Sequence, residues 1–434
     1  MENFDILFKN AVIILNKEKF IEKGFLGIKN GKISYVSDKE PEVKAVEVID
    51  CNDKIISPGF FNTHTHIPMT LLRGFADDLP LMEWLQKYIW PLEAKLLSSE
   101  YVRAGTYAGL LEMIKSGTIG FVDMYFFEEE VAECVDRAGI YGFLSVGILD
   151  FPTPYFKDSK EAIKKTEKLM DEYKNHERIR IYPGPHAIYT CSKETIISSV
   201  QLAKEKGGRI HIHLSETKKE VEDSLKNFNK TPVFHLSETG IFDLSVLAAH
   251  CVYLTDEEIE FLKDKKFYIS HNLTSNLKLA SGIAPLLKYK EKGLFITIGT
   301  DSASSNNNLD ILREMKLISL VHKGTQLDPT IFSAREVFDM ATRKGAIAMG
   351  FENSGEIKEG MSADLVIFDP YRENTVPFYD PYSYIVYSAG KGSVQSVMVK
   401  GKWILKDYEF KTIDEERILR ETREWRERIK NISL

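Results

Sequence analysis

Between residues 58 and 356 the sequence alternates short apolar runs with segments of helical periodicity. Seven apolar runs of strand length lie at residues 117–125, 141–149, 178–186, 209–216, 245–253, 266–272 and 293–301. An eighth run ends at His64, and segments such as DEEIEFLKDK repeat apolar residues every three or four positions between the runs. Eight strand–helix units over about 290 residues are typical of an α/β protein with a (β/α)8, TIM-like barrel. A doubly wound sheet is the alternative, but no G-x-G-x-x-G follows the first run.

The two ends of the chain have a different, β-rich pattern. Residues 1–57 hold apolar, β-branched runs with Asn30-Gly31 between two of them, which indicates a hairpin. Residues 357–434 repeat this character, and a second hairpin is expected at Gly401. We predict one small β-sandwich domain built from both termini and a separate catalytic barrel of residues 58–356. The last stretch, TIDEERILRETREWRERIKNISL, predicts a charged amphipathic helix packed on a neighbouring element.

Composition and charge narrow the classes of function. The 434 residues carry a formal net charge of −7, which argues against a nucleic-acid-binding surface as the main role. No apolar run approaches the roughly 20 residues that span a bilayer, and the start MENFDILFKN does not resemble a secretory signal. The four cysteines are far apart with no C-x-x-C pair, so we expect reduced, buried thiols in a cytoplasmic protein. Homo-oligomer formation is left open.

Polar side chains gather where the predicted strands end. His64 and His66 lie one residue apart at the end of the first strand, and the period of two points both imidazoles to one side. Six of the eight runs carry a histidine or an aspartate at this place: His64 with His66, His186, His213, His250, His271 and Asp301. Because the chemistry of such barrels lies at the carboxyl ends of the strands, we expect these residues to form one site.

The strand ends predict a metal site with three imidazoles and one carboxylate, on His64, His66, His213 and Asp301. This set of ligands suits one divalent metal per chain, Zn²⁺ first, with Fe²⁺ or Mn²⁺ as alternatives. Such a cation lowers the pKa of a bound water towards neutrality. Asp301 can bind the metal and also act as the general base. His250 is expected to hydrogen-bond the nucleophile and the developing tetrahedral centre.

Other titratable residues also lie at or near the predicted strand ends. Glu216 follows His213 by three positions and is expected at the barrel mouth, as an acid that protonates a ring nitrogen or a leaving group. The alternative for Glu216 is a first-turn helix residue that the helix dipole favours. His211 lies deeper in the same strand and is expected to support a ligand or to pack in the core. We expect ordinary surface positions for three further histidines, His176, His235 and His322.

Six motifs, in order along the chain, resemble the amidohydrolase superfamily. They are GFFNTHTHIPMTLLRGFADDLPLMEWLQKYIWPLEAKL, GPHAIYTCS, IHLSET, AAHCVYL, SHNLTSNLKLASGIAP and GTDSASSNNNLDILREM. Within the superfamily they look like the branch of 5′-methylthioadenosine/S-adenosylhomocysteine deaminases and chlorohydrolase-like proteins. The resemblance covers nearly the whole chain. It implies a divalent metal, usually zinc, on the four predicted ligands and a small nucleoside as substrate.

The resemblance also implies roles for individual residues. Glu93 in WPLEAKL would bind ribose hydroxyls, and His186 would contact the nucleoside. Glu216 would address the purine ring, and Asp301 would serve as the base. The implied reaction is hydrolytic deamination of adenine in 5′-methylthioadenosine, S-adenosylhomocysteine, adenosine or 5′-deoxyadenosine.

The sequence leaves alternatives open for the 5′ substituent of the nucleoside (its tail) and for the ring on which the enzyme acts. Members of the branch that accept S-adenosylhomocysteine tend to carry arginines near the third strand, where this sequence offers Tyr141 and Val146. An uncharged tail is therefore at least as strongly expected as homocysteine. One rival hypothesis is an aminohydrolase or chlorohydrolase acting on guanine, cytosine or a triazine-like ring. A second is a non-catalytic, metal-stabilised barrel that only binds a ligand. A deaminase of the cytidine type is excluded, since P-C-x-x-C is missing.

Overall fold

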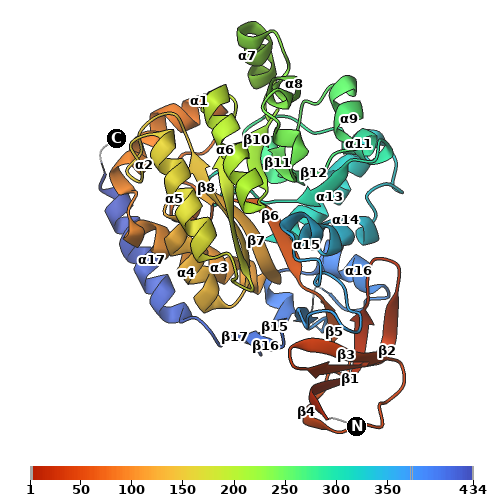
Figure 1. The fold of residues 1–434 in the computed structure, drawn as a ribbon. Coiled ribbons are helices and arrows are strands. Elements are labelled where there is room, and N and C mark those ends of the chain that lie inside the picture. The colour runs from red at the N-terminus through yellow and green to blue at the C-terminus, as the bar shows by residue number, and fades with distance from the viewer. Residues whose placement is uncertain (1–2, 372, 374, 433–434) are drawn as a thin grey trace.

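The computed structural model describes residues 3–371, 373 and 375–432. At its centre is a barrel of eight strands, around which the helices are arranged (Figure 1). Each strand overlaps one of the eight predicted apolar runs, so the predicted (β/α)8 barrel is confirmed. The barrel strands are β6 (Phe60–Thr65), β7 (Thr118–Tyr125), β8 (Tyr141–Ile148), β9 (Ile179–Pro185), β10 (Ile210–Leu214), β11 (Val246–His250), β12 (Phe267–His271) and β13 (Phe295–Ile298).

Backbone hydrogen bonds at two seams close the barrel. It consists of two four-stranded parallel sheets, β6-β7-β8-β9 and β10-β11-β12-β13. At one seam the N–H of His213 donates to the carbonyl of His186, with 3.0 Å between nitrogen and oxygen. At the other seam the N–H of Asp301 donates to the carbonyl of His64 at 2.9 Å. Four of the predicted site residues therefore join the sheets through their backbones.

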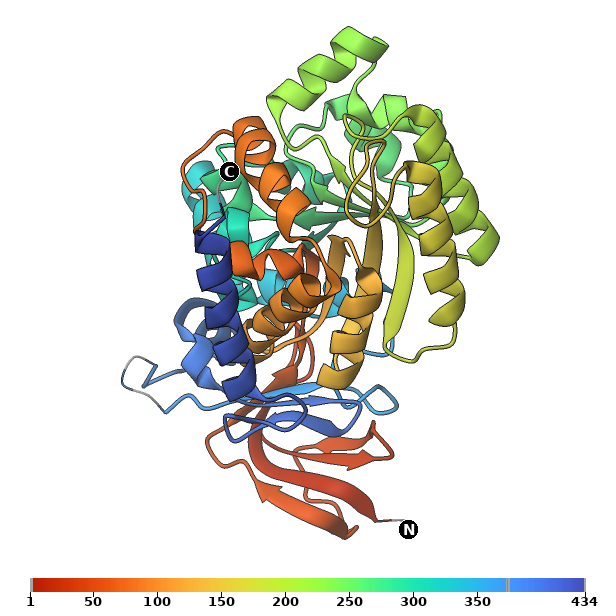
Figure 2. The ribbon, with the colours of Figure 1, turned by 90° about the vertical axis from the view of Figure 1, so that its left-hand side faces the viewer.

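Helices surround the barrel strands (Figures 1 and 2). Several begin at a residue whose side-chain oxygen accepts a backbone N–H of the first turn: Ser98, Asp158, Ser192, Thr217 and Thr255. Over the described ranges, every helix is too short or insufficiently apolar to cross a bilayer. The helical elements are η1 (Ile67–Leu72), α1 (Leu81–Glu83), η2 (Trp84–Ile89), α2 (Trp90–Leu96), α3 (Ser99–Lys115), α4 (Glu128–Ala138), α5 (Ser159–Glu172), α6 (Lys193–Lys206), α7 (Lys218–Phe228), α8 (Pro232–Ser237), η3 (Ile241–Asp243), α9 (Asp256–Leu262), α10 (Leu273–Lys278), α11 (Leu286–Glu291), α12 (Ala303–Asn306), α13 (Ile311–Gln326), α14 (Ala334–Ala341), α15 (Arg343–Met349), α16 (Pro381–Ser383), η4 (Tyr384–Ser388) and η5 (Lys391–Ser393).

The two ends of the chain meet in one nine-stranded sheet, at the bottom of Figures 1 and 2. Its order is β17-β16-β15-β14-β5-β1-β2-β3, with β4 paired to β1. Both predicted hairpins are present, and φ is positive at Asn30 and Gly31 and at Lys400 and Gly401, as a type I′ turn requires. The strands are β1 (Phe4–Ile14), β2 (Phe20–Lys29), β3 (Lys32–Ser37), β4 (Ala45–Asp50), β5 (Ile55–Pro58), β14 (Leu365–Phe368), β15 (Val394–Val399), β16 (Lys402–Lys406) and β17 (Glu409–Phe410).

This sheet curls on itself into the small sandwich that the sequence predicts. Phe8 of β1 and Trp403 of β16 belong to strands that are not neighbours in the sheet, yet their ring centroids lie 6.0 Å apart. The predicted C-terminal helix is α17 (Glu415–Lys430). It packs on α3 through Trp425 and Tyr101, whose ring centroids are 5.6 Å apart. Residues from both termini therefore share a hydrophobic core separate from that of the barrel, which includes Ile6 and Phe8 from one end of the chain and Leu365 and Met398 from the other.

The prediction that His235 and His322 lie on the surface is wrong, because both are buried. His322 follows buried apolar residues of α13 at helical spacing and faces the barrel, with its Nε2 3.2 Å from the Nε2 of His271. His235 stacks on Phe228 with 3.9 Å between ring centroids. His176 alone of the three keeps partial exposure. Whether a histidine in a helix is buried depends on which face of the helix it occupies, and the residue type alone does not reveal this.

Phe60, at the start of β6, tests the packing between the barrel and the terminal sheet. It is buried against Phe338 and Phe368, with ring centroids 6.0 and 6.2 Å away. The variant Phe60→Ala leaves a cavity in a rigid core, so we expect the free energy of unfolding to fall by about 3–5 kcal/mol, measured by chemical denaturation. The control Val46→Ala, on the exposed face of β4, should change it by less than about 0.5 kcal/mol. Equal losses in both variants would contradict this packing.

Candidate metal centre and active site

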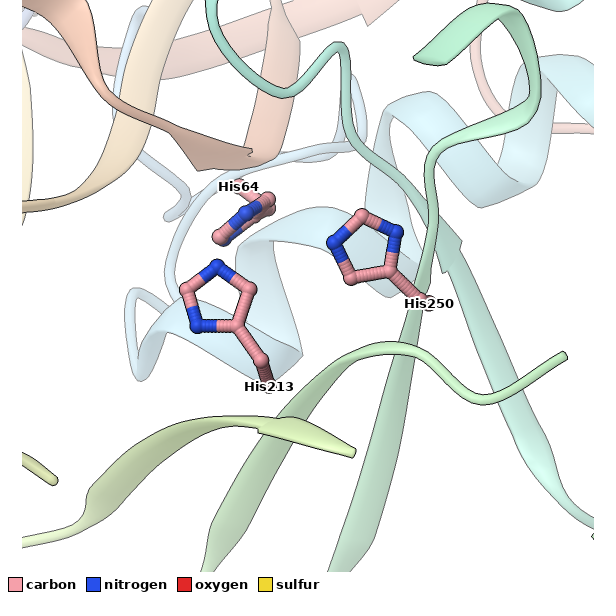
Figure 3. A group of neighbouring side chains, drawn as sticks. All are labelled: His64, His213 and His250. Atoms are coloured by element: carbon pink, nitrogen blue, oxygen red, sulfur yellow. The ribbon is translucent and has the colours of Figure 1, made fainter. Parts of the chain in front are cut away.

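The predicted ligands converge at the carboxyl-terminal end of the barrel strands. His64 and His66 come from the end of β6, His213 from β10, and Asp301 from the loop after β13. Oδ1 of Asp301 lies 3.4 Å from Nε2 of both His64 and His66, and Nε2 of His213 lies 3.3 Å from Nε2 of His66. Figure 3 shows the imidazoles of His64, His213 and His250 around a common space. Side chains from three distant segments of the sequence thus share one centre.

The outward nitrogen of each imidazole has a partner, which leaves Nε2 facing the centre. Nδ1 of His66 donates to the carbonyl of Met124 at 2.6 Å, and Nδ1 of His213 donates to the carbonyl of His186 at 2.9 Å. Nδ1 of His64 lies 2.9 Å from Nε2 of His211, which therefore supports a predicted ligand. Since a carbonyl only accepts, the first two rings carry their hydrogen on Nδ1 and present the Nε2 lone pair inward.

Burial keeps these imidazoles neutral. It lowers the pKa of His64 to about 4 and the pKa of His213 well below its usual value. Nε2 of His64 is buried and has no hydrogen-bond partner within the described chain. Burial alone would raise the pKa of Asp301, but interactions with His64 outweigh it and hold that pKa well below its ordinary range. Neutral imidazoles beside an ionised carboxylate are the donors that a divalent cation needs.

Among the described residues, two groups of three donors could hold a cation, and they share His64. One is His64, His66 and Asp301, and the other is His64, His213 and His250; within each group the ligand atoms lie within 4.8 Å of one another. The geometry thus makes His250 a further nitrogen donor, besides the role that the sequence predicts for it.

Glu216 and His250 lie beside Asp301. Nε2 of His250 is 3.8 Å from Oε2 of Glu216 and 3.9 Å from Oδ2 of Asp301. Nδ1 of His250 donates to Oδ1 of Asn276 at 2.7 Å, so its Nε2 faces the two carboxyl groups. Oε1 of Glu216 accepts a hydrogen bond from the Ser281 hydroxyl at 3.0 Å. Burial raises the pKa of Glu216, which favours the protonated form of this carboxyl.

A cavity of about 330 Å³ opens onto these side chains. Its wall includes the predicted substrate-contacting residues Glu93, His186, Glu216 and Asp301. Much of the remaining wall is apolar or aromatic and includes Trp84, Trp90, Tyr125, Phe126, Leu149 and Phe151. Among the described lining residues there is no lysine or arginine. The cavity therefore suits an uncharged ligand with a flat ring and a few polar groups.

Glu93 is a buried carboxyl group in this wall. It belongs to α2, and the Tyr125 hydroxyl donates a hydrogen bond to its Oε1. Burial raises the pKa of Glu93 to about 7. His186 lies across the site, its Nδ1 2.9 Å from the Thr190 hydroxyl. Without the family resemblance, Glu93 would have been assigned to a helix surface.

Several groups that hold the site in place were missed from the sequence. The Ser275 hydroxyl donates to Oδ2 of Asp301 at 2.6 Å. Together with Asn276 and Ser281 it stands in the motif SHNLTSNLKLASGIAP, whose polar residues are the signal that could have revealed all three. His250 and Asp301 both have positive φ, so the chain turns sharply where it leaves their strands.

The expectation that Tyr141 and Val146 replace arginines beside the substrate is wrong. Tyr141 begins β8, at the opposite end of the barrel from the site, and its hydroxyl donates to Oδ2 of Asp364 at 2.9 Å. Val146 is buried, and the residues of this stretch that line the cavity are Gly147, Leu149 and Phe151. The absence of cationic side chains from the described cavity wall, rather than these two residues, bears on the substrate tail.

The parallel barrel, with imidazoles and carboxyl groups gathered at one rim around a cavity, is the architecture of a barrel hydrolase. The comparison with family models makes the assignment specific. The chain belongs to the amidohydrolase family, whose model matches residues 55–404.

Similar proteins align with nearly the whole chain. It is 44% identical to the 5-methylthioadenosine/S-adenosylhomocysteine deaminase of Aquifex aeolicus, over 99% of this chain and 98% of that protein. It is 43% identical to the 5′-deoxyadenosine deaminase of Methanocaldococcus jannaschii, over 96% and 98%. The crystal structure of an adenosine deaminase from Xanthomonas campestris with bound zinc superimposes with a TM-score of 0.95 at 32% identity, covering 99% of this chain and all of that one.

Glu93 should make stability depend on pH. Because burial raises its pKa from 4.5 to about 7, the folded protein retains a proton that the unfolded chain releases. Stability from this group is therefore lost as pH rises through that window. We expect the difference in free energy of unfolding between wild type and Glu93→Gln to change by up to about 3 kcal/mol across the window, in denaturation series at several pH values. The exposed control Glu22→Gln should follow wild type, and identical pH slopes for all three proteins would refute the expectation.

Proposed function

We propose that this chain hydrolyses the amino group from the adenine ring of a 5′-modified adenosine, forming the inosine analogue and ammonia, in a metal-dependent reaction. The observation that carries the proposal is a single cavity onto which a metal-type donor set and two further buried carboxyl groups, Glu216 and Glu93, converge. The relatives named for deamination of such nucleosides, at 43% and 44% identity, support it.

We infer that one divalent metal per chain, zinc in preference to Fe²⁺ or Mn²⁺, binds His64, His66, His213 and Asp301. The inward Nε2 atoms and the unpartnered, buried Nε2 of His64 fit such an ion. When bound, the cation supplies a positive charge that acidifies a water molecule. Zinc is favoured because the similar adenosine deaminase structure contains it.

The side chains around the cavity supply the proton transfers. Asp301 accepts a proton from the attacking water, whose oxygen adds to C6 of adenine, while Glu216 donates its proton to N1 of the ring. His250, oriented by Asn276, hydrogen-bonds the oxygen on the tetrahedral carbon. Asp301 then passes its proton to the amino group, which leaves as ammonia. Glu216 regains a proton as the C6 hydroxyl becomes a carbonyl, so the site returns to its starting state.

Glu93 and His186 are proposed to hold the sugar. A carboxylate offers two acceptor oxygens, which match the two adjacent hydroxyl groups of a ribose. Free guanine, cytosine and triazines have no such diol to bind a buried carboxyl group. Glu93 therefore favours a nucleoside over the alternative in which the same centre acts on another ring.

The cavity wall favours an apolar substituent at the 5′ position. The amino-acid tail of S-adenosylhomocysteine carries two charges, and desolvating them against Trp84, Trp90 and Phe151 without a cationic partner is costly. A methylthio group or a plain methyl group meets no such penalty. We therefore propose 5′-methylthioadenosine and 5′-deoxyadenosine as the preferred substrates.

A cytoplasmic location is part of the proposal. The four cysteines, Cys51, Cys134, Cys191 and Cys251, are free and buried, as expected from their spacing. Unpaired thiols are typical of a reducing compartment.

Metal removal tests the centre. A chelator should abolish ammonia release from the purified protein, and Zn²⁺ should restore it. His213→Ala should lose the metal and lower kcat/KM at least about 10³-fold, because the water is no longer activated. Metal content and ammonia are measured together, with the distant His176→Gln as the matched control that keeps both. Full activity of metal-free wild type would overturn the proposal.

A substrate panel tests the reaction and the tail. We expect kcat/KM for 5′-methylthioadenosine and 5′-deoxyadenosine to exceed that for S-adenosylhomocysteine at least about tenfold, because of the uncompensated charges of its tail. Ammonia release and the ultraviolet change of the purine report turnover, and adenosine, guanine, cytosine and triazines complete the panel. Turnover of a free ring but of no nucleoside supports the rival chemistry instead, and equal use of S-adenosylhomocysteine contradicts the tail assignment.

A further inference from the structure

Two carboxyl groups beside the cavity are fully buried, Asp123 of β7 and Glu128 at the start of α4. Oδ1 of Asp123 accepts hydrogen bonds from the Thr65 hydroxyl at 2.7 Å and from the N–H of Ile67 at 2.6 Å. Thr65 and Ile67 are the two neighbours of His66. Asp123 therefore holds the Thr65 side chain and the Ile67 backbone, on either side of a proposed metal ligand, without contributing to the cavity wall.

Glu128 holds the strand end that faces His66. Its Oε1 accepts the N–H of Tyr125 at 2.8 Å. The preceding carbonyl, of Met124, accepts the hydrogen bond from Nδ1 of His66 at 2.6 Å. The Tyr125 hydroxyl in turn donates to Glu93. Hydrogen bonds therefore link Asp123 to the segment that carries His66, and link Glu128 through Tyr125 to Glu93 of the proposed ribose site.

The remaining oxygens of this pair, Oδ2 of Asp123 and Oε2 of Glu128, are buried without a donor in the described part of the chain. The two carboxyl groups lie within hydrogen-bonding reach of each other. No ion pair joins either of them to a lysine or arginine among the described residues. Two facing carboxylates in dry surroundings repel, whereas one shared proton gives a strong O–H···O⁻ bond. Burial raises the pKa of Asp123 to about 7, and burial with the charge of Asp123 raises the pKa of Glu128 well above its usual value.

We propose that Asp123 and Glu128 share one proton, and that this acid–carboxylate pair aims His66 at the centre by fixing Thr65 and Ile67. Both are positioning residues, since neither lines the cavity. The effect on catalysis rests on the proposed function. The shared proton itself does not, because it follows from the contacts within the pair.

Amide substitutions test the count of protons. Asp123→Asn and Glu128→Gln each supply one N–H donor in place of the shared proton, so each should keep zinc affinity and kcat/KM within about threefold of wild type. In the double variant two amide groups face each other, and each amide oxygen is already needed by other donors. Zinc affinity and kcat/KM should then fall at least about tenfold below the product of the single effects. Multiplicative effects of the two substitutions would overturn the proposal.

Infrared difference spectra test the proton directly and need neither zinc nor substrate. Glu128→Gln at neutral pH should lose one protonated-carboxyl C=O band and no carboxylate band, whichever residue carries the proton. The exposed control Glu22→Gln should lose a carboxylate band. If Glu128→Gln loses a carboxylate band instead, both groups are ionised and the proposal fails. This readout remains valid if the chain proves not to deaminate adenosines, so the two proposals fail separately.

Discussion

The barrel closes through the backbones of the residues whose side chains form its site. The N–H groups of His213 and Asp301 cross the two seams to the carbonyls of His186 and His64. Closing the ring therefore fixes the strands that carry the donors relative to one another before any ligand arrives. Such preorganisation reduces the rearrangement that a cation or a transition state would otherwise require. The same backbone hydrogen bonds therefore stabilise the closed barrel and fix the geometry of the site.

In the closed barrel, the Nε2 atom of each imidazole of His66, His213 and His250 is directed at the centre because its Nδ1 hydrogen-bonds a group outside the centre. The carbonyls of Met124 and His186 set the tautomers of His66 and His213, and Asn276 sets that of His250. Desolvation lowers the pKa of the three proposed imidazole ligands, His64, His66 and His213, and raises the pKa of the carboxyl groups of Glu93 and Glu216. At Asp301 and His250 the neighbouring groups outweigh desolvation and favour the charged form. One physical effect, exclusion of water, thus prepares both the ligands and the acids of the site.

Much of the architecture could be predicted because it is local. The strand period of two and the helix period of 3.6 identify the barrel units. Because the carboxyl ends of all barrel strands lie at one rim, His64, His213 and Asp301, each at or just after a strand end, are expected to lie together. The hairpins at Gly31 and Gly401 follow from their turn residues. The roles of the site residues and the domain boundaries at residues 57 and 357 stay predictions.

The rest depends on contacts between distant segments. Glu93 lies in a helix, and only tertiary packing turns it into the cavity, so the resemblance alone indicated it. The sequence does not show that Tyr141 lies at the far end of its strand, because an apolar run does not reveal which of its residues approach the rim. Asp123 and Glu128 look like ordinary strand and helix residues until β6 and β7 are paired. A local sequence pattern does not show which distant segments of the chain contact one another in the fold.

The terminal sheet sets an order of events during translation. Ile55 of β5 pairs with Phe368 of β14, so β5 keeps one open edge while the ribosome synthesises the entire barrel between them. An open strand edge readily pairs with other chains, and contacts of long sequence separation form late. The nascent polypeptide is therefore most exposed to misassembly, and most dependent on chaperones, when the barrel has emerged but β14–β17 have not.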